Sequence, residues 1–585
     1  MQTLDIFRAV WILCIFLLVF LFFPAYLFPG RDSSSTVLRV AGNFVRALLI
    51  ATTAGLLLTS LKIFNTTTVV LLFLGALMIA WVRKRAGSSR NWLAGLQEAT
   101  LGVVRLMEGQ PIFHRSGAPV SADQPNRSLW PKAFQGREML AAAFSVVVIT
   151  TGVLYFAYPL RELRLNQPEQ YEVLLRGREL MLNLHGHQRP LIFPSVIATI
   201  AFLSSADPMQ VTRFLSPLLE LSIVLATGLV IRKCTRGAVA AIATIYCLGV
   251  AAFETVGNEA AVPISTMEKL ESVFRTSLTR TRANPEFEVG LLCLLLALVF
   301  LAHWHEDSRA WDSLVDAGCC LLLVGIVSQF LLIVCVMAAG AVLLWPVMGV
   351  VVFVLMSYGL AAYATLSSNF GITGEVRLIL PLAAVLAVGC FLGLIETKLI
   401  APMGRVAEGL LLLACVAIAI VWSRPHPLAS QYLEYDKAAC ETQVIADRFP
   451  RQTWAVVAPT EQLAETLGVG GYEDLAEFVE KYQDQASNPK FHIPDAPEDL
   501  FVYVEKRPFQ YFSREPQFVP LGVLADSTYR SYRSPAGRAS LESAALQLCE
   551  GYRKSHDDAD VFFEDENLRI YHVHQQQAPK TGSGG

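Results

Sequence analysis

The chain has 585 residues, of which 54% are hydrophobic and only 17% are charged, and its mean hydropathy is +0.45. This composition is too apolar for an ordinary soluble globular protein and is typical of a polytopic membrane protein. A net charge of −3 excludes the strongly basic surface that nucleic-acid binding needs, so no nucleic-acid partner is expected.

Taken in chain order, eleven apolar segments approach the roughly 20 residues that a helix needs to cross a hydrocarbon core of about 30 Å. They lie near residues 7–29, 41–60, 66–83, 139–159, 212–231, 236–253, 287–303, 313–335, 339–361, 378–397 and 405–422. The first has no small-residue cleavage site, so we expect a retained helix and not a signal peptide. The prediction is a polytopic α-helical protein of the cell inner membrane with about 11 transmembrane helices.

Clusters of basic residues predict the orientation of these helices. "VRKRAGSSR", from residue 82, and "RKCTRG", from residue 232, indicate cytoplasmic segments, because cytoplasmic loops are enriched in lysine and arginine. The loop at 160–190 is then extracytoplasmic. A short apolar stretch within 191–207, "LIFPSVIATIAFLSSAD", is expected to form a buried or interfacial half-helix.

Two alternatives remain open for the C-terminal half. If every apolar segment crosses once, the C-terminal region is cytoplasmic. If one re-entrant or split segment lies between residues 313 and 361, where Pro346 can break a helix, that region is extracytoplasmic. Lys398 and Arg405 favour the second count, because it places their positive charges inside.

The composition divides the chain into five parts. Residues 1–85 form an N-terminal three-helix membrane segment, 86–136 a cytoplasmic amphipathic helix and linker, 137–422 the transmembrane core, 423–578 a soluble extracytoplasmic α/β domain, and 579–585 an appended tail.

The soluble domain shows alternating helix and strand patterns. "TWAVVAP" and "LFVYVEK" predict buried strands, two helices are expected to start near Thr460 and Tyr472, and "VFFEDENLRIYHVHQ" predicts a hairpin that turns near Asp565 to Asn567. A long helix is expected in "AGRASLESAALQLCEGYRKSH". Cys440 and Cys549 are the only cysteines in this domain, and an oxidising compartment would let them pair.

The loop at 160–190 carries the strongest candidate site. If Pro168 begins a helix, then Glu169, Glu172, Arg176 and Glu179 share one face through steps of three and four residues. Charge next to a membrane is costly and marks sites or pathways. The alternative is a solvated face with a Glu172–Arg176 pair that contributes a few tenths of a kcal/mol.

This region resembles the opening module of the GT-C fold glycosyltransferases that use polyprenyl-phosphate sugars. Glu169 and Tyr171 stand in the family's acidic and aromatic places, "RPLIFP" in its proline-rich helix start, and Arg213 in its arginine place. The resemblance covers about residues 137–422. Pro168 replaces the first acidic residue of the family pattern, which leaves the catalytic carboxylate open between Glu169 and Glu172.

The resemblance implies an inverting sugar transfer from a lipid-linked donor to an unknown extracytoplasmic acceptor. A carboxylate acts as the base, and Arg377 contacts the phosphate that leaves. Further substrate contacts are expected at five residues: Tyr171, His185, His187, Arg189 and Arg213. His185 and His187 have no third ligand nearby, so no metal site is predicted and no cofactor is certain, although a divalent metal is compatible with the loop.

Three other functions compete with a transferase. A transporter or flippase would carry intramembrane charges and repeats, and a lipid-linked oligosaccharide polymerase or ligase would place its arginine-rich loop later in the chain. The third is a non-catalytic scaffold on a GT-C-like core, for which residues 1–85 offer a surface for a membrane protein partner.

Overall fold

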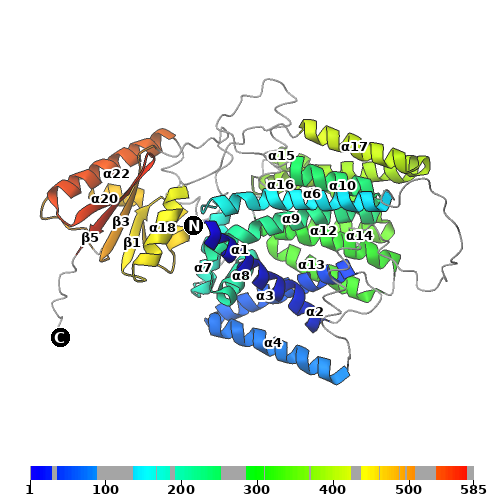
Figure 1. Ribbon diagram of the computed structural model, residues 1–585, viewed down its shortest axis with the longest axis horizontal. Helices are drawn as coiled ribbons and strands as arrows, with labels where there is room; N and C mark the ends of the chain where they lie inside the picture. The colour runs from blue at the N-terminus through cyan, green and yellow to red at the C-terminus, as the bar shows by residue number, and fades with distance from the viewer. Residues whose placement is uncertain are drawn as a thin grey trace.

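The structure is a computed structural model that describes residues 2–28, 36–87, 136–165, 168–184, 192–251, 285–307, 310–367, 370–422, 436–459, 461–486, 488–494, 497–507 and 535–575. A bundle of apolar helices forms its larger part, and a small α/β domain lies against one end of the bundle (Figure 1). Five described helices are long and apolar enough to cross a membrane: Ile6–Leu27, Val37–Ser60, Pro208–Thr235, Pro285–Glu306 and Leu382–Met403. Six shorter apolar helices accompany them. The predicted class of helical membrane protein is thus confirmed.

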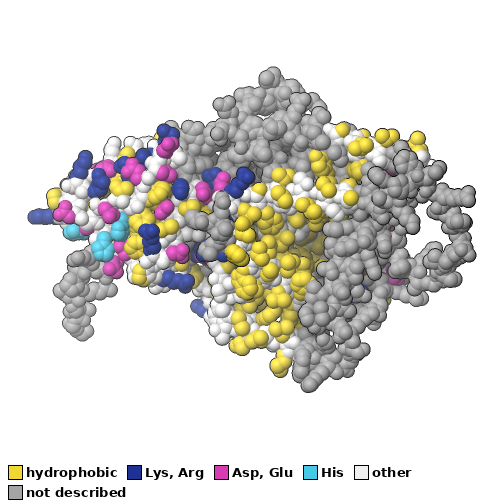
Figure 2. Space-filling model, viewed as in Figure 1, with side chains coloured by type: hydrophobic (Ala, Val, Ile, Leu, Met, Phe, Trp, Pro, Cys, Tyr) yellow, Lys and Arg dark blue, Asp and Glu magenta, His cyan; other side chains and the backbone are white. Residues whose placement is uncertain are grey.

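Surface composition separates the two parts. Figure 2 shows hydrophobic side chains over the described surface of the bundle, while Lys, Arg, Asp and Glu gather on the α/β domain. Leu71 and Met78 of the bundle are 62% and 68% exposed. A protein in water would bury such side chains, so this surface fits contact with lipid.

The three predicted N-terminal helices are present and pack on the core. They are α1 (Gln2–Leu17), which continues through η1 (Leu18–Phe22) into α2 (Phe23–Leu27), then α3 (Thr36–Ser60) and α4 (Thr66–Gly87). Ile12 and Val45 are fully buried in one apolar cluster with Phe214 and Leu295 of later helices. These N-terminal helices therefore share the core of the bundle.

The remaining bundle helices surround one buried helix. They are α6 (Gly136–Arg161), α8 (Ile192–Ser204), α9 (Pro208–Thr235), α10 (Ala238–Tyr246) with η3 (Cys247–Ala251), α12 (Pro285–Glu306), α13 (Trp311–Val327), α14 (Gln329–Leu344), α15 (Pro346–Ser367), α16 (Phe370–Ile395) with η4 (Glu396–Ile400) and η5 (Ala401–Met403), and α17 (Arg405–Trp422). In α12, 94% of the most apolar stretch of 18 residues is buried, so α12 is the central helix of the bundle. Most residues of α8 are buried too, which selects the buried form from the two that the sequence left open.

Residues 311–367 form three helices where the sequence predicted two spans. Trp345 has an extended backbone just before Pro346, so a helix boundary lies inside the predicted span 339–361, where the second alternative allowed one. A second break at Ser328 was missed: its backbone is extended, and its Oγ accepts a hydrogen bond from the Leu331 N–H at 3.1 Å. This serine caps α14 from inside an apolar run, where hydropathy alone shows no boundary.

Contacts between helix ends show how the bundle is arranged. At one end, Lys233 of α9 pairs with Glu306 of α12, and the Cys234 thiol donates to the Pro346 carbonyl at 3.5 Å. At the other end, Asp436 of the α/β domain accepts a hydrogen bond from the Leu163 N–H, which follows α6. The α/β domain and Leu163 therefore lie at the same end of the bundle, opposite the basic residues that close α9.

The α/β domain is built on one mixed sheet. Its elements are α18 (Asp436–Arg448), β1 (Trp454–Ala458), α19 (Glu461–Thr466), β2 (Gly471–Asp474), α20 (Leu475–Tyr482), β3 (Asp499–Glu505), α22 (Pro535–Ser555), β4 (Ala559–Glu564) and β5 (Leu568–His574). The strand order is β2-β1-β3-β5-β4, parallel from β2 to β3 and antiparallel from β3 to β4. One face packs against α20 and α22 and the other against α18.

The structure corrects a helix start and a cysteine pairing in this domain. The helix expected to start near Tyr472 begins at Leu475, because Tyr472 pairs with β1 as part of β2, and Asp474 caps the helix by accepting from the Ala476 and Glu477 N–H groups. Thr460 lies outside the described residues. Cys440 and Cys549 are both free, since α18 and α22 pack on opposite faces of the sheet and keep the two thiols apart.

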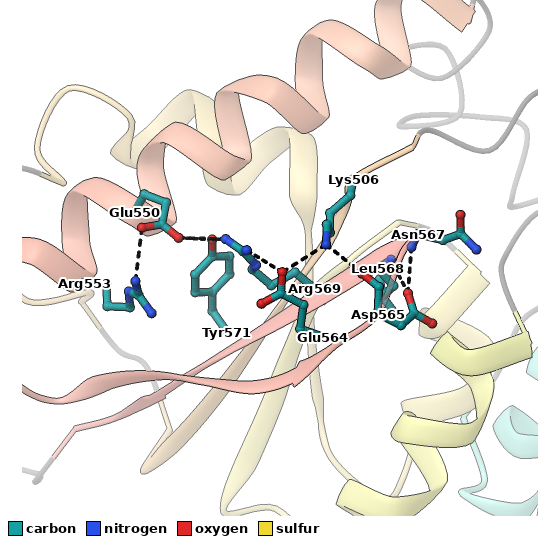
Figure 3. Close-up of polar contacts among 9 residues, drawn as sticks. All are labelled: Lys506, Glu550, Arg553, Glu564, Asp565, Asn567, Leu568, Arg569 and Tyr571. Carbon is teal, nitrogen blue, oxygen red and sulfur yellow. Dashed lines mark hydrogen bonds and ion pairs between the residues drawn. The ribbon is translucent and has the colours of Figure 1, made fainter.

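The predicted C-terminal hairpin is confirmed, and a polar network holds it (Figure 3). The Asp565 carboxylate accepts from the Asn567 and Leu568 N–H groups at 2.7 Å each, which closes the turn. Beside the turn, Glu564 accepts from Arg569 at 2.5 Å and from Lys506 at 3.0 Å. These contacts join the hairpin to the end of β3.

Candidate functional site

The helix α7 (Pro168–Met181) lies between the bundle and the α/β domain and carries the predicted site. It begins at Pro168, as predicted, because a proline at the first position loses no helical hydrogen bond. One side approaches α8 closely: a Cβ added at Gly177 would lie 3.3 Å from Ile197 Cγ2. A larger residue at 177 would push α7 away from the bundle.

A second side of α7 forms the junction with the α/β domain. Leu174 and Leu175 are buried together with Met209 of α9, Ala439 of α18 and Ala464 of α19. The amphipathic pattern of α7 is thus explained by two partners, the bundle and the soluble domain.

Arg178 makes the polar part of this junction. Its Nη2 donates to both carboxylate oxygens of Asp207 at 3.0 Å, and its Nη1 donates to the Leu467 carbonyl at 3.1 Å. Asp207 also caps α9 by accepting from the Met209 N–H. One guanidinium therefore ties α7, the start of α9 and the end of α19 together. Sequence reasoning did not single out Arg178 or Asp207.

The third side of α7 is the predicted charged face. Arg176 Nη1 donates to Glu179 Oε2 at 2.9 Å, with side chains 14% and 21% exposed, and Glu172 is half-buried one turn earlier. Arg176 and Glu179 thus form an ion pair on this face, whereas the alternative considered from the sequence was a solvated face with a Glu172–Arg176 pair. Glu169 belongs to the first turn of α7, and its side chain is outside the described part of the structure. Charges this poorly hydrated interact strongly with any ligand that reaches them.

Two of the predicted substrate contacts are buried in the protein. The Tyr171 hydroxyl accepts from the Leu165 N–H at 3.2 Å, and the side chain is 1% exposed in the α7 junction. Arg213 Nε donates to the Pro159 carbonyl at 2.5 Å, and its guanidinium lies 4.7 Å from the centre of the Phe214 ring. Tyr171 thus holds the backbone at Leu165 and Arg213 holds the backbone at Pro159, so both act near the start of the 160–190 loop.

The end of that loop is anchored by a residue the sequence did not indicate. Glu286, at the start of α12, accepts from the Ile192 and Phe193 N–H groups at 2.8 Å each and so caps α8. The remaining predicted contacts, His185, His187, Arg189 and the Arg377 side chain, fall outside the described residues.

Within the part of the chain that the structure describes, α7 contributes to no set of side chains that could hold a metal; the one such set belongs to the α/β domain. A comparison with protein-family models and a search of curated proteins both find no match for this chain. The functional argument therefore depends on the residues of this protein alone.

Proposed function

We propose that the protein is an inverting glycosyltransferase that moves a sugar from a polyprenyl-phosphate donor to an acceptor on the extracytoplasmic face of the cell inner membrane. The observation that carries the proposal is the charged face of α7, where Glu172 and the Arg176–Glu179 pair lie half-buried at one end of an apolar bundle. A lipid-linked donor presents its head group at such a place. A GT-C-like core of about 11 transmembrane helices is part of the same proposal.

The proposed chemistry needs a carboxylate and a cation. Glu169, or Glu172 in its place, removes the proton from the acceptor hydroxyl while the hydroxyl oxygen attacks the anomeric carbon. The bond from that carbon to the donor phosphate breaks, and polyprenyl phosphate leaves with its charge stabilised by Arg377. Glu172 suits the role of a base because it lies on the face that carries Arg176.

The proposed orientation places α7 and the α/β domain outside the cytoplasm. Arg232, Lys233 and Arg236 lie at the opposite end of the bundle, and the enrichment of such residues on the cytoplasmic side supports this assignment. Because the soluble domain is docked directly on α7, it is suited to orient an acceptor beside the donor.

The test is a turnover assay in proteoliposomes with a panel of polyprenyl-phosphate hexoses and pentoses, which measures released polyprenyl phosphate. Glu169→Gln or Glu172→Gln should lower kcat by about 10²- to 10⁴-fold, the usual contribution of a general base. Arg377→Ala should lower kcat/KM for the donor. Glu477→Gln on α20 is the matched control, since this exposed carboxylate lies in the soluble domain and pairs only with Lys481 at 3.8 Å among the ion pairs described.

A second candidate is a non-catalytic scaffold or partner-binding subunit. It is favoured by the use of Tyr171 and Arg178 for holding the α/β domain, which gives α7 a structural task. In that case the parent protein itself would release no polyprenyl phosphate from any donor of the panel, while Arg178→Ala would loosen the soluble domain and any partner bound to it.

A further inference from the structure

The hairpin strand β5 and its neighbour β3 bring two imidazoles and one carboxylate together. His572 and His574 are two residues apart on β5, so they project from the same face of the sheet. Asp499 on β3 is the direct cross-strand partner of His574. By the alternation of the strands, the three side chains lie on the same face of the sheet as Phe501 and Ile570, the face that α18 packs against.

The donor atoms converge on one oxygen. Asp499 Oδ1 lies 2.8 Å from His572 Nε2 and 2.8 Å from His574 Nδ1, and the three atoms are within 4.8 Å of one another. The Asp499 side chain is 9% exposed and that of His574 is 49% exposed. The cluster is therefore anchored on its inner side and open to solvent on its outer side.

The second nitrogen of His572 also faces a carboxylate. His572 Nδ1 lies 3.3 Å from Asp560 Oδ1 on β4, so both ring nitrogens point at carboxylate oxygens. A neutral imidazole has one N–H and can donate to only one of them. A cation held between His572 Nε2 and Asp499 would leave the single N–H of the ring for Asp560.

We propose that Asp499, His572 and His574 bind one Zn²⁺ ion. The ligands are Asp499 Oδ1, His572 Nε2 and His574 Nδ1, a set of two imidazoles and one carboxylate that suits zinc, while Ca²⁺ and Mg²⁺ prefer oxygen donors. The site is separate from the charged face of α7 and does not depend on the proposed transferase activity.

The distances fit an ion after a small movement. Tetrahedral zinc with bonds of about 2.1 Å keeps its ligand atoms roughly 3.4 Å apart. The two nitrogen–oxygen separations of 2.8 Å must open by about half an ångström when zinc replaces the shared protons, and the exposed His574 ring can make that adjustment. Three protein ligands leave one position for water or for a ligand that approaches from solvent.

The residues around His572 hold its ring in a fixed position, as a metal ligand requires. Its ring stacks on Phe501, with centroids 4.7 Å apart and an interplanar angle of 9°, and Phe449 packs beside it. Asp560, whose side chain is 75% exposed, lies 3.3 Å from Nδ1 and can accept a hydrogen bond from Nδ1–H when Nε2 binds the metal. Carboxylate–histidine–metal arrangements of this kind orient the ring and strengthen the ligand.

The test is calorimetric titration of the full-length, untagged protein in detergent with Zn²⁺ after chelator treatment. The expected result is one Zn²⁺ per chain, with an affinity at least about 100-fold lower in His572→Ala and in His574→Ala. In Asp560→Asn the affinity should fall about 10- to 100-fold, the usual effect of removing a residue that hydrogen-bonds to a metal ligand. His492→Ala is the matched control, because this exposed histidine packs on His556 in the same domain but outside the cluster.

Two further measurements guard against a folding artefact. Asp499→Asn keeps the size of the side chain, and substitution with Co²⁺ should give a visible absorption band of a tetrahedral site that this variant lacks. Absence of zinc binding, or binding that His574→Ala leaves unchanged, overturns the proposal. An equal loss of zinc affinity in His492→Ala and His574→Ala would also overturn it, since scattered surface histidines would then account for the measured heat of zinc binding.

Discussion

Arg178 on α7 donates to both carboxylate oxygens of Asp207 and, through its other terminal nitrogen, to the Leu467 carbonyl at the end of α19. Three segments that lie far apart in the chain thus meet at one buried guanidinium, whose side chain is 8% exposed. Arginine suits this place because its planar fork serves two acceptors at once. The position of the α/β domain over α7 depends on this contact together with the apolar cluster around Leu174.

Arg178→Ala should loosen the α/β domain from the bundle. The substitution removes charge-assisted hydrogen bonds worth about 1.5–3 kcal/mol, and the 37% exposure of Asp207 places the effect near the lower value. Hydrogen exchange of the amides in α19 should become about tenfold faster, whereas the interior strand β3 should keep its protection. Arg553→Ala on α22, a 41% exposed arginine paired with Glu550 at 3.5 Å, is the control and should change neither region.

Asp436→Asn should speed the alkylation of Cys440. Burial and the neighbouring Asp436 carboxylate raise the pKa of Cys440 to about 12, so the thiol is protonated near neutral pH. Removing that charge lowers the pKa, and each unit of decrease raises the thiolate fraction about tenfold. The asparagine oxygen can still accept from the Leu163 N–H, so docking should persist. The measurement is the rate of iodoacetamide labelling by mass spectrometry, with Cys549 as the internal control.

Mass spectrometry of the same protein, digested without reducing agent, tests whether the thiols of Cys440 and Cys549 are separate. Cys440 and Cys549 should stay reduced under non-reducing conditions whichever side of the membrane holds the domain, because the sheet lies between α18 and α22. A disulfide between them would contradict the packing of these helices.

Local signals in the sequence predicted part of this structure. Pro168 predicted the start of α7, and the acidic turn near Asp565 predicted the hairpin, because proline and aspartate fix the backbone within a few residues. Ser328 gave no usable signal, since a capping serine inside an apolar run looks like the rest of a span. The apparent length of an apolar segment therefore hid a helix boundary.

The candidate site was predictable only where it lies on one helix. The charged face of α7 follows from helical periodicity, so Glu172, Arg176 and Glu179 were found together. The junction was missed because it joins residues distant in the chain, 29 apart for Arg178 and Asp207 and 273 apart for Leu163 and Asp436. The His572–His574 spacing was visible, but its partner Asp499 became evident only from the pairing of β3 with β5.

Gly237→Ala should destabilise the bundle. Glu396 accepts from the Ala238, Val239 and Ala240 N–H groups and so caps α10, and a Cβ at position 237 would lie 2.7 Å from Glu396 Oε2 and 2.8 Å from Gly393 Cα. The backbone of α10 or α16 must shift, at a cost of about 1–3 kcal/mol. Gly409→Ala in α17, where an added Cβ meets nothing within 4 Å, should be neutral or stabilising. Thermal unfolding midpoints in detergent compare the two, and equal midpoints would show that α10 tolerates the methyl group.

Glu564→Gln should weaken the hairpin in a pH-dependent way. Hydrogen bonds from Arg569 and Lys506 lower the pKa of Glu564 to about 2, from an ordinary value of 4.5. A carboxyl whose folded pKa is lowered stabilises the fold above its unfolded pKa, and this contribution is lost as the pH falls through the folded value. The melting midpoint of the variant should therefore lie below that of the parent protein at about pH 6, and the gap should narrow between about pH 4.5 and pH 2. Added salt should also reduce the gap, since these groups are near the surface. A gap that stays constant over this pH range would mean that the glutamine acts through packing and not through the lost charge.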